Sequence, residues 1–137
     1  MLGEDDYTRR LHFHVERIKN QQVISLPNQD AGLSFINSDE AARFLYWVEN
    51  QTLEGPINAC SKGELSLREV INLIEEEVNE KAIVQKETDE DHLSPFGVTD
   101  SLYMDTTKAE QAGFEFQVVT DWLPKLVSRI HSSMTAF

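Results

Sequence analysis

The stretch from Leu33 to Val48 reads LSFINSDEAARFLYWV and joins an extended apolar run to the start of a helix. Residues 33–36 are short and apolar, which predicts a strand. Ser38, followed by two acidic residues, is typical of a helix N-terminus. The apolar residues behind it recur at the spacing of one helix face, and they are Ala41, Phe44, Leu45 and Val48. A strand followed directly by a helix is typical of an α/β fold.

The same alternation continues toward the N-terminus. Apolar residues at helical spacing predict a first helix over residues 7–20, capped by Asp5 and Asp6. The β-prone run 22–26 predicts a strand, and the turn-forming residues after it separate it from the strand described above. Two strands therefore bracket one loop before the central helix.

The C-terminal half repeats the pattern. Ile57-Asn58-Ala59-Cys60 predicts a buried strand. Ser66 and Glu69 have the spacing of a capping box, in which each side chain satisfies a backbone amide of the other residue, and this predicts a helix from Ser66. Residues 82–85 predict a further short strand.

The remaining segments include two more helices. Residues 86–95 (KETDEDHLSP) are too polar and too broken for a buried element and predict an exposed loop. A short helix is expected over residues 105–112, ended by Gly113 in the left-handed conformation. A last helix is expected from Asp121, and residues 132–137 are expected to fray. Together the elements predict one domain over residues 1–137, of α/β (α+β) class, with a small mixed sheet and about four to five helices.

Composition and charge narrow the function. The chain has 137 residues, 40% of them hydrophobic and 26% charged, as in ordinary globular domains. Twelve basic residues against 24 acidic ones give a net charge of −12, which repels phosphate backbones and anionic lipid surfaces. We therefore expect neither nucleic-acid binding nor membrane association. A single cysteine, Cys60, excludes an internal disulfide and fits a reducing, cytoplasmic location.

Several familiar kinds of chemistry are excluded. The glycines are at least eight positions apart, so neither a GxGxxG turn nor a P-loop can form. Tyr103 and Lys108 are five apart, whereas the tyrosine and lysine of short-chain dehydrogenases are four apart. His12 and His14 are two apart, so on a helix they face different sides and are interpreted as surface or cleft-lining residues. No catalytic or metal-binding residue is therefore predicted.

One helix entrance gathers hydrogen-bonding groups of several types. Asp6, Arg9, Arg10 and His12 lie within seven positions, although arginine is not favoured at a helix N-terminus. One interpretation is an ordinary capping turn with solvated arginines. The other is that Arg9 or Arg10 faces a cleft and holds an anionic or polar ligand. The residues alone leave both interpretations open.

The order of the motifs resembles the C-terminal part of extended short-chain dehydrogenases, the NAD(P)-dependent epimerase, dehydratase and reductase family. Gly3 to Arg10 (GEDDYTRR) is similar to the Gly-Pro-x-Asp-x-Thr-x-Arg segment of a reductase-like branch, with Glu4 in place of proline. Residues 33–42 are similar to the family's Phe-Ile-x-Val-x-Asp-x-Ala strand and helix, with Ser38 for valine and Glu40 for aspartate.

Three later segments continue the resemblance, which spans almost the whole chain. Residues 55–59 are similar to the family's Gly-x-Tyr-Asn strand, and residues 66–69 to the following Ser-x-x-Glu helix start. Residues 104–114 are similar to the late Asp-x-x-Lys-Ala-x-x-x-Gly-Phe segment. The family's glycine-rich Rossmann half and its Tyr-x-x-x-Lys pair have no counterpart here. The chain therefore resembles a C-terminal fragment of a longer enzyme.

The resemblance implies a function for that fragment. It implies the substrate-binding portion of an NAD(P)-dependent reductase or epimerase, inactive alone, whose missing N-terminal Rossmann half binds NAD or NADP. This chain alone is expected to bind no cofactor. The resemblance further implies that a small-molecule substrate lies near Asp6, Arg9, Arg10 and His12, with Arg10 the first choice, and that Phe35 packs toward the junction.

Two alternative functions remain open, and self-association of the chain is predicted. The chain could instead be a stand-alone binding or protein-interaction module derived from that half, or an unrelated acidic α/β domain with accidental motif matches. Self-association through an exposed apolar face is expected, because several aromatic residues must share limited interior space. These residues are Phe13, Phe35, Phe44 and Trp47. The sequence does not identify the substrate.

Overall fold

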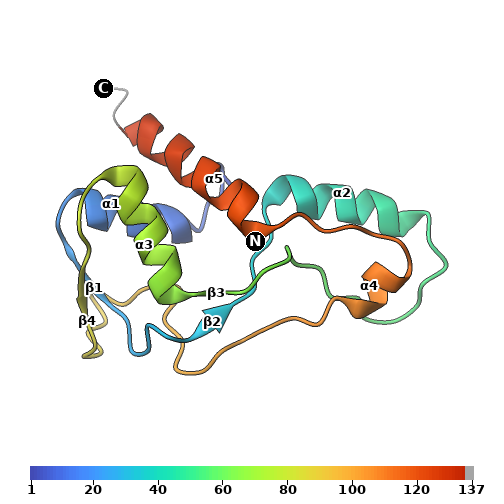
Figure 1. Cartoon of the computed structure of the whole chain (residues 1–137), viewed down its shortest axis with the longest axis horizontal. Coiled ribbons are helices and arrows are strands. Elements are labelled where there is room, and N and C mark those ends of the chain that lie inside the picture. The colour runs from blue at the N-terminus through green and yellow to red at the C-terminus, as the bar shows by residue number, and fades with distance from the viewer. Residues whose placement is uncertain (135–137) are drawn as a thin grey trace.

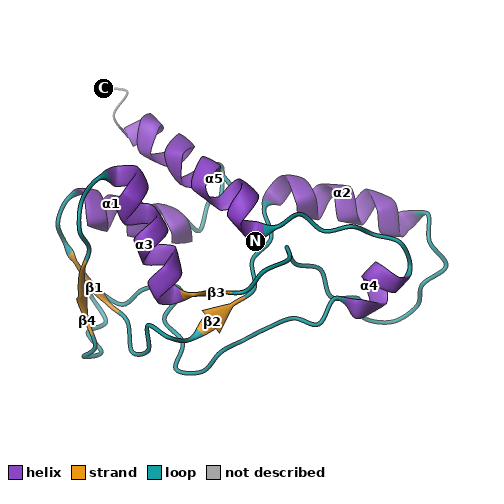
Figure 2. Cartoon of the chain, in the orientation of Figure 1, coloured by secondary structure: helices purple, strands orange, loops and turns teal. Residues whose placement is uncertain are grey.

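The computed structural model describes residues 1–134, which form five helices and four short strands (Figures 1 and 2). In chain order these are α1 (Arg10–Lys19), β1 (Val23–Ser25), β2 (Gly32–Leu33), α2 (Ser38–Glu49), β3 (Leu65–Ser66), α3 (Leu67–Val78), β4 (Ile83–Gln85), α4 (Thr107–Gln111) and α5 (Val119–Met134). The predicted mixture of helices and strands is confirmed. Of the residues expected to fray, 132–134 belong to α5 and 135–137 lie outside the described residues.

The strands form two separate pairs. β1 and β4 are parallel, with Val23 beside Ile83, whereas β2 and β3 are antiparallel, with Gly32 beside Ser66. The sequence predicted one small mixed sheet. The structure instead has two small sheets, one parallel and one antiparallel. Because each sheet has only two strands, the helices supply most of the core.

The main core lies where α1, α3 and α5 pack together, at one end of the molecule (Figure 1). The capping box that begins α3 is present: the Glu69 amide donates to Ser66 Oγ at 3.1 Å and the Ser66 amide donates to Glu69 Oε1 at 3.2 Å. Each helix buries one apolar stripe in this core. The fully buried side chains include Leu11, Val15, Ile18, Leu67, Ile74, Leu123, Val127 and Ile130.

A smaller aromatic cluster lies at the other end of the molecule, between α2 and the segment that leads into α5 (Figure 1). The ring of Phe44 lies 5.2 Å from that of Phe114 and 5.8 Å from that of Phe116, measured between centroids. Of the aromatic residues predicted to crowd the interior, Phe35 and Phe44 are buried and Phe13 and Trp47 are half-buried. The exposed large apolar residues are others, among them Leu45, Tyr46, Leu102, Tyr103 and Met104.

Several local predictions are wrong. The strand expected over residues 33–36 ends at Leu33. The first helix begins at Arg10, because Arg9 adopts a left-handed conformation (φ 51°) that interrupts the helix, and neither Asp5 nor Asp6 caps it. The segment 57–60 pairs with no neighbour as a strand. The helix α2 buries Phe44, but its next residue, Leu45, is 65% exposed, because the α2 face that meets the protein is centred on Glu40 and Phe44.

Candidate functional site

A cavity of about 210 Å³ lies where the start of α1, the strand β2 and a loop C-terminal to β4 meet. Most of the residues that line it are apolar, and Arg10 contributes a guanidinium group. The lining residues are Met1, Leu2, Arg10, Leu33, Ser34, Phe35, Pro95, Phe96 and Val98. Segments far apart in the sequence therefore build one concave surface that combines apolar side chains with a few polar groups, which is a common composition for a small-molecule site.

Arg10 is held in place by its neighbours. Its Nη2 donates to the Met1 carbonyl oxygen at 2.7 Å, and its Nε donates to Thr8 Oγ1 at 3.1 Å. The Thr8 hydroxyl in turn donates to Asp6 Oδ1 at 2.6 Å. The Arg10 side chain remains 38% exposed, so its guanidinium is fixed yet accessible.

The carboxylate of Asp6 lies beside the Arg10 guanidinium. Its Oδ2 is buried, has no hydrogen-bond partner among the described residues, and lies 3.9 Å from Arg10 Nε. Burial by itself raises the pKa of Asp6, but the hydrogen bonds from Thr8 and the nearby Arg10 charge hold that pKa below its ordinary value. Asp6 is therefore a negative neighbour that keeps the guanidinium at the cavity.

The other predicted binding residues lie elsewhere. The left-handed backbone of Arg9 directs its side chain to Glu16, with which it forms an ion pair at 2.5 Å. Arg9 lines a separate depression of about 340 Å³ together with Phe13 and Pro95. His12 is 5% exposed and its Nε2 is bonded to the Glu4 carbonyl oxygen at 3.0 Å. The structure thus brings Arg10 and Phe35 together, with Asp6 behind them, and leaves Arg9 and His12 outside the cavity.

His14 and Ser94 were not predicted for this site. His14 is fully buried, so its interpretation as a surface or cleft-lining residue is wrong, and its Nε2 lies 2.6 Å from Ser94 Oγ. Burial lowers the pKa of His14 to about 4, against a smaller opposing effect of the hydrogen bond to the Arg10 carbonyl. The helical spacing from Leu11 and Ile18 was a signal of burial, whereas nothing in the sequence pairs His14 with a residue 80 positions away.

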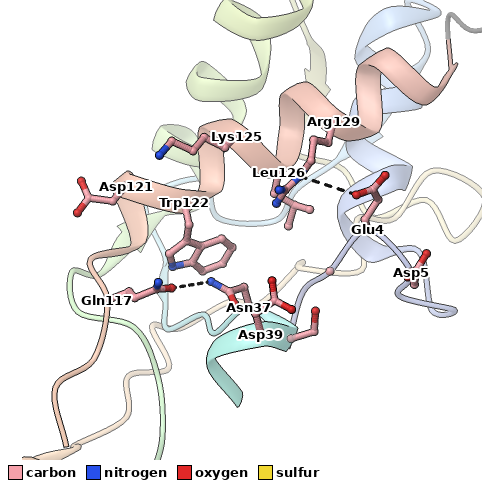
Figure 3. A pocket seen from close by; sticks show the side chains of 12 residues that line it. Glu4, Asp5, Asn37, Asp39, Gln117, Asp121, Trp122, Lys125, Leu126 and Arg129 are labelled. Carbon is pink, nitrogen blue, oxygen red and sulfur yellow. Dashed lines mark hydrogen bonds and ion pairs between the residues drawn. The ribbon is translucent and has the colours of Figure 1, made fainter. Parts of the chain in front are cut away.

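A larger groove of about 500 Å³ lies between α5, the N-terminus of α2 and residues 3–5 (Figure 3). Figure 3 shows Glu4 pointing toward Arg129 and Asn37 toward Gln117 across this groove. The first pair is separated by 3.8 Å, and Asn37 Nδ2 donates to Gln117 Oε1 at 3.0 Å. These two pairs connect the N-terminal segment to α5 and the start of α2 to the segment before α5. Because their polar groups are already bound to one another, this groove is not the favoured ligand site.

The described residues offer no obvious place for a metal or a dinucleotide. Residues 1–134 contain no group of three His, Cys, Asp or Glu side chains that could hold a metal ion. A dinucleotide cradle needs a glycine-rich turn between a strand and a helix, and the N-caps of α1 to α4 are Arg9, Asn37, Ser66 and Thr106. The residues present therefore do not fit NAD or NADP. Within the same residues, no helix combines the length and apolar character needed to cross a membrane.

Comparison with solved structures identifies the fold. The chain matches a protein described as an epimerase from Burkholderia cenocepacia with a TM-score of 0.67 at 22% identity, covering 96% of this chain and 43% of that one. It matches UDP-glucose 4-epimerase from Thermus thermophilus, in complex with NAD, with a TM-score of 0.69 at 14% identity, covering 92% and 40%. It matches GDP-L-fucose synthetase from Naegleria fowleri, bound to NADP, with a TM-score of 0.65 at 18% identity, covering 92% and 40%.

These likenesses concern the fold. The chain spans only about two fifths of each of these structures, and its fold is that of the matched portion of these enzymes. No protein-family model and no curated protein matches the sequence. The predicted resemblance is therefore confirmed at the level of the fold.

Proposed function

We propose that this chain, which has the fold of the C-terminal portion of NAD(P)-dependent epimerases, forms the substrate-binding wall of a reductase or epimerase. The observation that carries the proposal is the fixed guanidinium of Arg10 at a cavity whose lining residues are mostly apolar. A ring-shaped substrate can rest on Phe35 and Phe96, while its anionic or polar group accepts hydrogen bonds from Arg10.

In this proposal, cofactor binding and the reaction itself belong to a Rossmann half that is separate from this chain. Matched structures contain NAD or NADP, whereas the residues described here do not form a cradle for either. A Rossmann half would supply the hydride donor and the proton relay, and this chain would bind and orient the substrate. The isolated chain is then expected to show no turnover with NADH or NADPH.

Binding to the isolated chain tests the cavity directly. The probes are UDP-glucose, UDP-glucuronic acid and GDP-L-fucose, because matched structures are of enzymes named for these sugars or bound to them. In nuclear magnetic resonance titrations of isotope-labelled protein, at least one probe should shift the Arg10 Nε signal and the methyl signals of Leu33 and Val98. Arg10→Ala should weaken that binding by a factor of about 10 to 100, the usual effect of losing a charged hydrogen bond.

Arg43→Ala is the matched control, because it removes the same charge from an exposed position on α2. It should leave the affinity unchanged. Equal affinities of Arg10→Ala and the unaltered chain, or no response of the cavity signals to any probe, would contradict the proposal. Turnover of NADH or NADPH by the isolated chain would contradict the proposed division between two parts.

The alternative, a stand-alone binding or interaction module, is distinguished at the level of the gene. An upstream reading frame that encodes a GxxGxxG turn and a Tyr-x-x-x-Lys pair supports the enzyme part. A native transcript that begins at Met1 supports the module, whose cavity would then bind a ligand without turning it over.

A further inference from the structure

We propose that His14 and Ser94 are positioning residues that fix the width of the Arg10 cavity by holding Phe96 against the first turn of α1, at the Arg10 backbone carbonyl. This inference rests on the proposed function, in which that cavity binds the substrate. The side chains of His14 and Ser94 are buried beside the cavity and are not among its lining residues. They act through two residues that do line it.

The hydrogen bonds of the pair form one continuous chain. His14 Nδ1 lies 2.7 Å from the Arg10 carbonyl oxygen, which can only accept, so Nδ1 carries the hydrogen. In the neutral imidazole Nε2 is then an acceptor, and the Ser94 hydroxyl donates to it at 2.6 Å. Ser94 Oγ accepts from the Phe96 amide at 3.0 Å. Each of these atoms has a partner of the right kind, so the chain has one consistent direction from Phe96 to Arg10.

Ring contacts extend the same connection into the cavity. The ring of Phe96 stacks on His14 with a centroid distance of 4.6 Å and an interplanar angle of 11°. Its edge meets the ring of Phe35 at 5.4 Å and 68°. Phe96 is therefore held between a buried histidine and another lining residue, in two of the geometries that aromatic pairs favour.

Residues 86–106, which place Phe96 at the cavity, contain no helix or strand and only two isolated bridges, at Leu93 and Leu102. The position of the Phe96 ring therefore depends on its side-chain contacts. Backbone bonds attach the loop to β1: the Ser94 amide donates to the Ser25 carbonyl at 3.0 Å. This bond holds the loop but does not orient the Phe96 ring. We infer that loss of the His14 and Ser94 connection leaves the loop attached, frees the ring, and makes the cavity wider and less selective for ring size.

Nuclear magnetic resonance of the isolated chain tests this without a known ligand. Ser94→Ala removes a single oxygen atom and should shift the methyl signals of Leu33 and Val98 and speed the ring flips of Phe96. His14→Phe keeps a ring beside Phe96 but removes both hydrogen bonds of the imidazole, and should shift the same methyl signals. Ser94→Ala also removes the acceptor of the Phe96 amide, and should raise the exchange rate of that amide at least tenfold. The double variant should show no more than the larger single effect, because both substitutions break one chain.

Ile130→Val is the control, because Ile130 is fully buried in α5 and does not line the cavity. It should lower the protection of core amides generally and leave the Leu33 and Val98 signals in place. Variants of His14 and Ser94 that behave like this control, or that leave the cavity signals and Phe96 unchanged, would overturn the positioning role.

Binding measurements distinguish the proposed substrate-binding function from the positioning role of His14 and Ser94. If UDP-glucose, UDP-glucuronic acid or GDP-L-fucose binds the unaltered chain, Ser94→Ala should reduce the difference in affinity among the three probes. If none of them binds while Ser94→Ala still changes the cavity signals, the proposed function fails and the connection between Phe96 and Arg10 stands. Unchanged discrimination among probes that do bind would contradict the effect on selectivity.

Discussion

The Ser61 hydroxyl donates a hydrogen bond to Glu40 Oε1 in the interior, where Glu40 is fully buried near the start of α2. The other carboxyl oxygen of Glu40 accepts from the Gln117 amide. Ser61 Oγ also accepts from the indole nitrogen of Trp122 at 2.8 Å. One glutamate and one serine therefore join α2, the segment after residue 60 and α5.

Replacing Glu40 should destabilise the protein strongly. Glu40→Ala leaves the Ser61 hydroxyl and the Gln117 amide without their acceptor and creates a cavity, with an expected loss of about 2 to 4 kcal/mol in the free energy of unfolding. Glu40→Gln keeps the size of the side chain but places an amide NH₂ against one of the two donors, with a loss of about 1 to 3 kcal/mol. Urea denaturation followed by circular dichroism measures both losses.

Glu77→Ala is the control for Glu40, because it makes the same substitution at an exposed glutamate on α3. It should alter the free energy of unfolding by less than about 0.5 kcal/mol. A Glu40→Ala variant that is as stable as Glu77→Ala would show that the buried hydrogen bonds contribute little.

Stability should fall as the pH falls from about 6.5 to about 4, because of His14. Its pKa is lowered from 6.5 to about 4 in the folded protein, so between these values the unfolded chain binds a proton that the folded chain does not. The full contribution is present above the unfolded pKa and is lost as the pH approaches the folded one. The loss amounts to roughly 3 kcal/mol.

Urea denaturation at several pH values measures this dependence. Carboxyl groups also titrate in the lower part of the range, so the slope is compared with that of His14→Phe, in which position 14 does not titrate. The variant should be less stable near neutral pH and should have the shallower slope between pH 6.5 and 4. Titration of the His14 ring signals near pH 6.5 in the folded protein would contradict this prediction.

The isolated chain should self-associate at high concentration. Leu102, Tyr103 and Met104 are each more than half exposed. Leu102 lies beside β2, and its amide donates to the Gly32 carbonyl at 2.9 Å. Contiguous exposed apolar residues favour association in water. In sedimentation velocity runs, the mean sedimentation coefficient should rise with concentration, and the Leu102→Ser and Met104→Ser double variant should reduce the rise.

Glu87→Ser is a suitable control for that measurement, because it alters an exposed polar residue in the acidic loop outside this apolar segment. It should leave the concentration dependence as it is in the unaltered chain. A sedimentation coefficient that stays at the monomer value over the whole concentration range would rule out self-association.

Local signals in the sequence predicted those elements that local chemistry decides. The predicted capping box at Ser66 and Glu69 and the predicted left-handed Gly113 after α4 are both confirmed. Both features depend only on residues that are close together in the chain. The exposure of Leu45 was not predictable from periodicity. Its position depends on which face of α2 meets the protein, and that face is selected by the distant partners of Glu40.

The candidate site shows the same limit. Arg10 and Phe35 were both proposed, and the structure places both at one cavity. Arg9 has a positive φ and its side chain pairs with Glu16, whereas Arg10 begins α1, and the sequence carries no sign of that positive φ. Ser94 lies in a polar loop that was expected to be exposed. In the structure its side chain is buried, and its hydroxyl donates a hydrogen bond to His14 Nε2.

The parallel pairing of β1 with β4 also bears on how the chain reaches its folded state. Ser25 and Gln85, which are paired in register and joined by a side-chain hydrogen bond at 2.8 Å, are 60 residues apart in the sequence. Closing so long a loop costs chain entropy before any contact is gained, and parallel pairs offer no hairpin from which to begin. Pairing of such distant segments raises the mean sequence separation of contacts in this helix-rich protein, so its folding should be slower than that of a simple helical bundle of the same length.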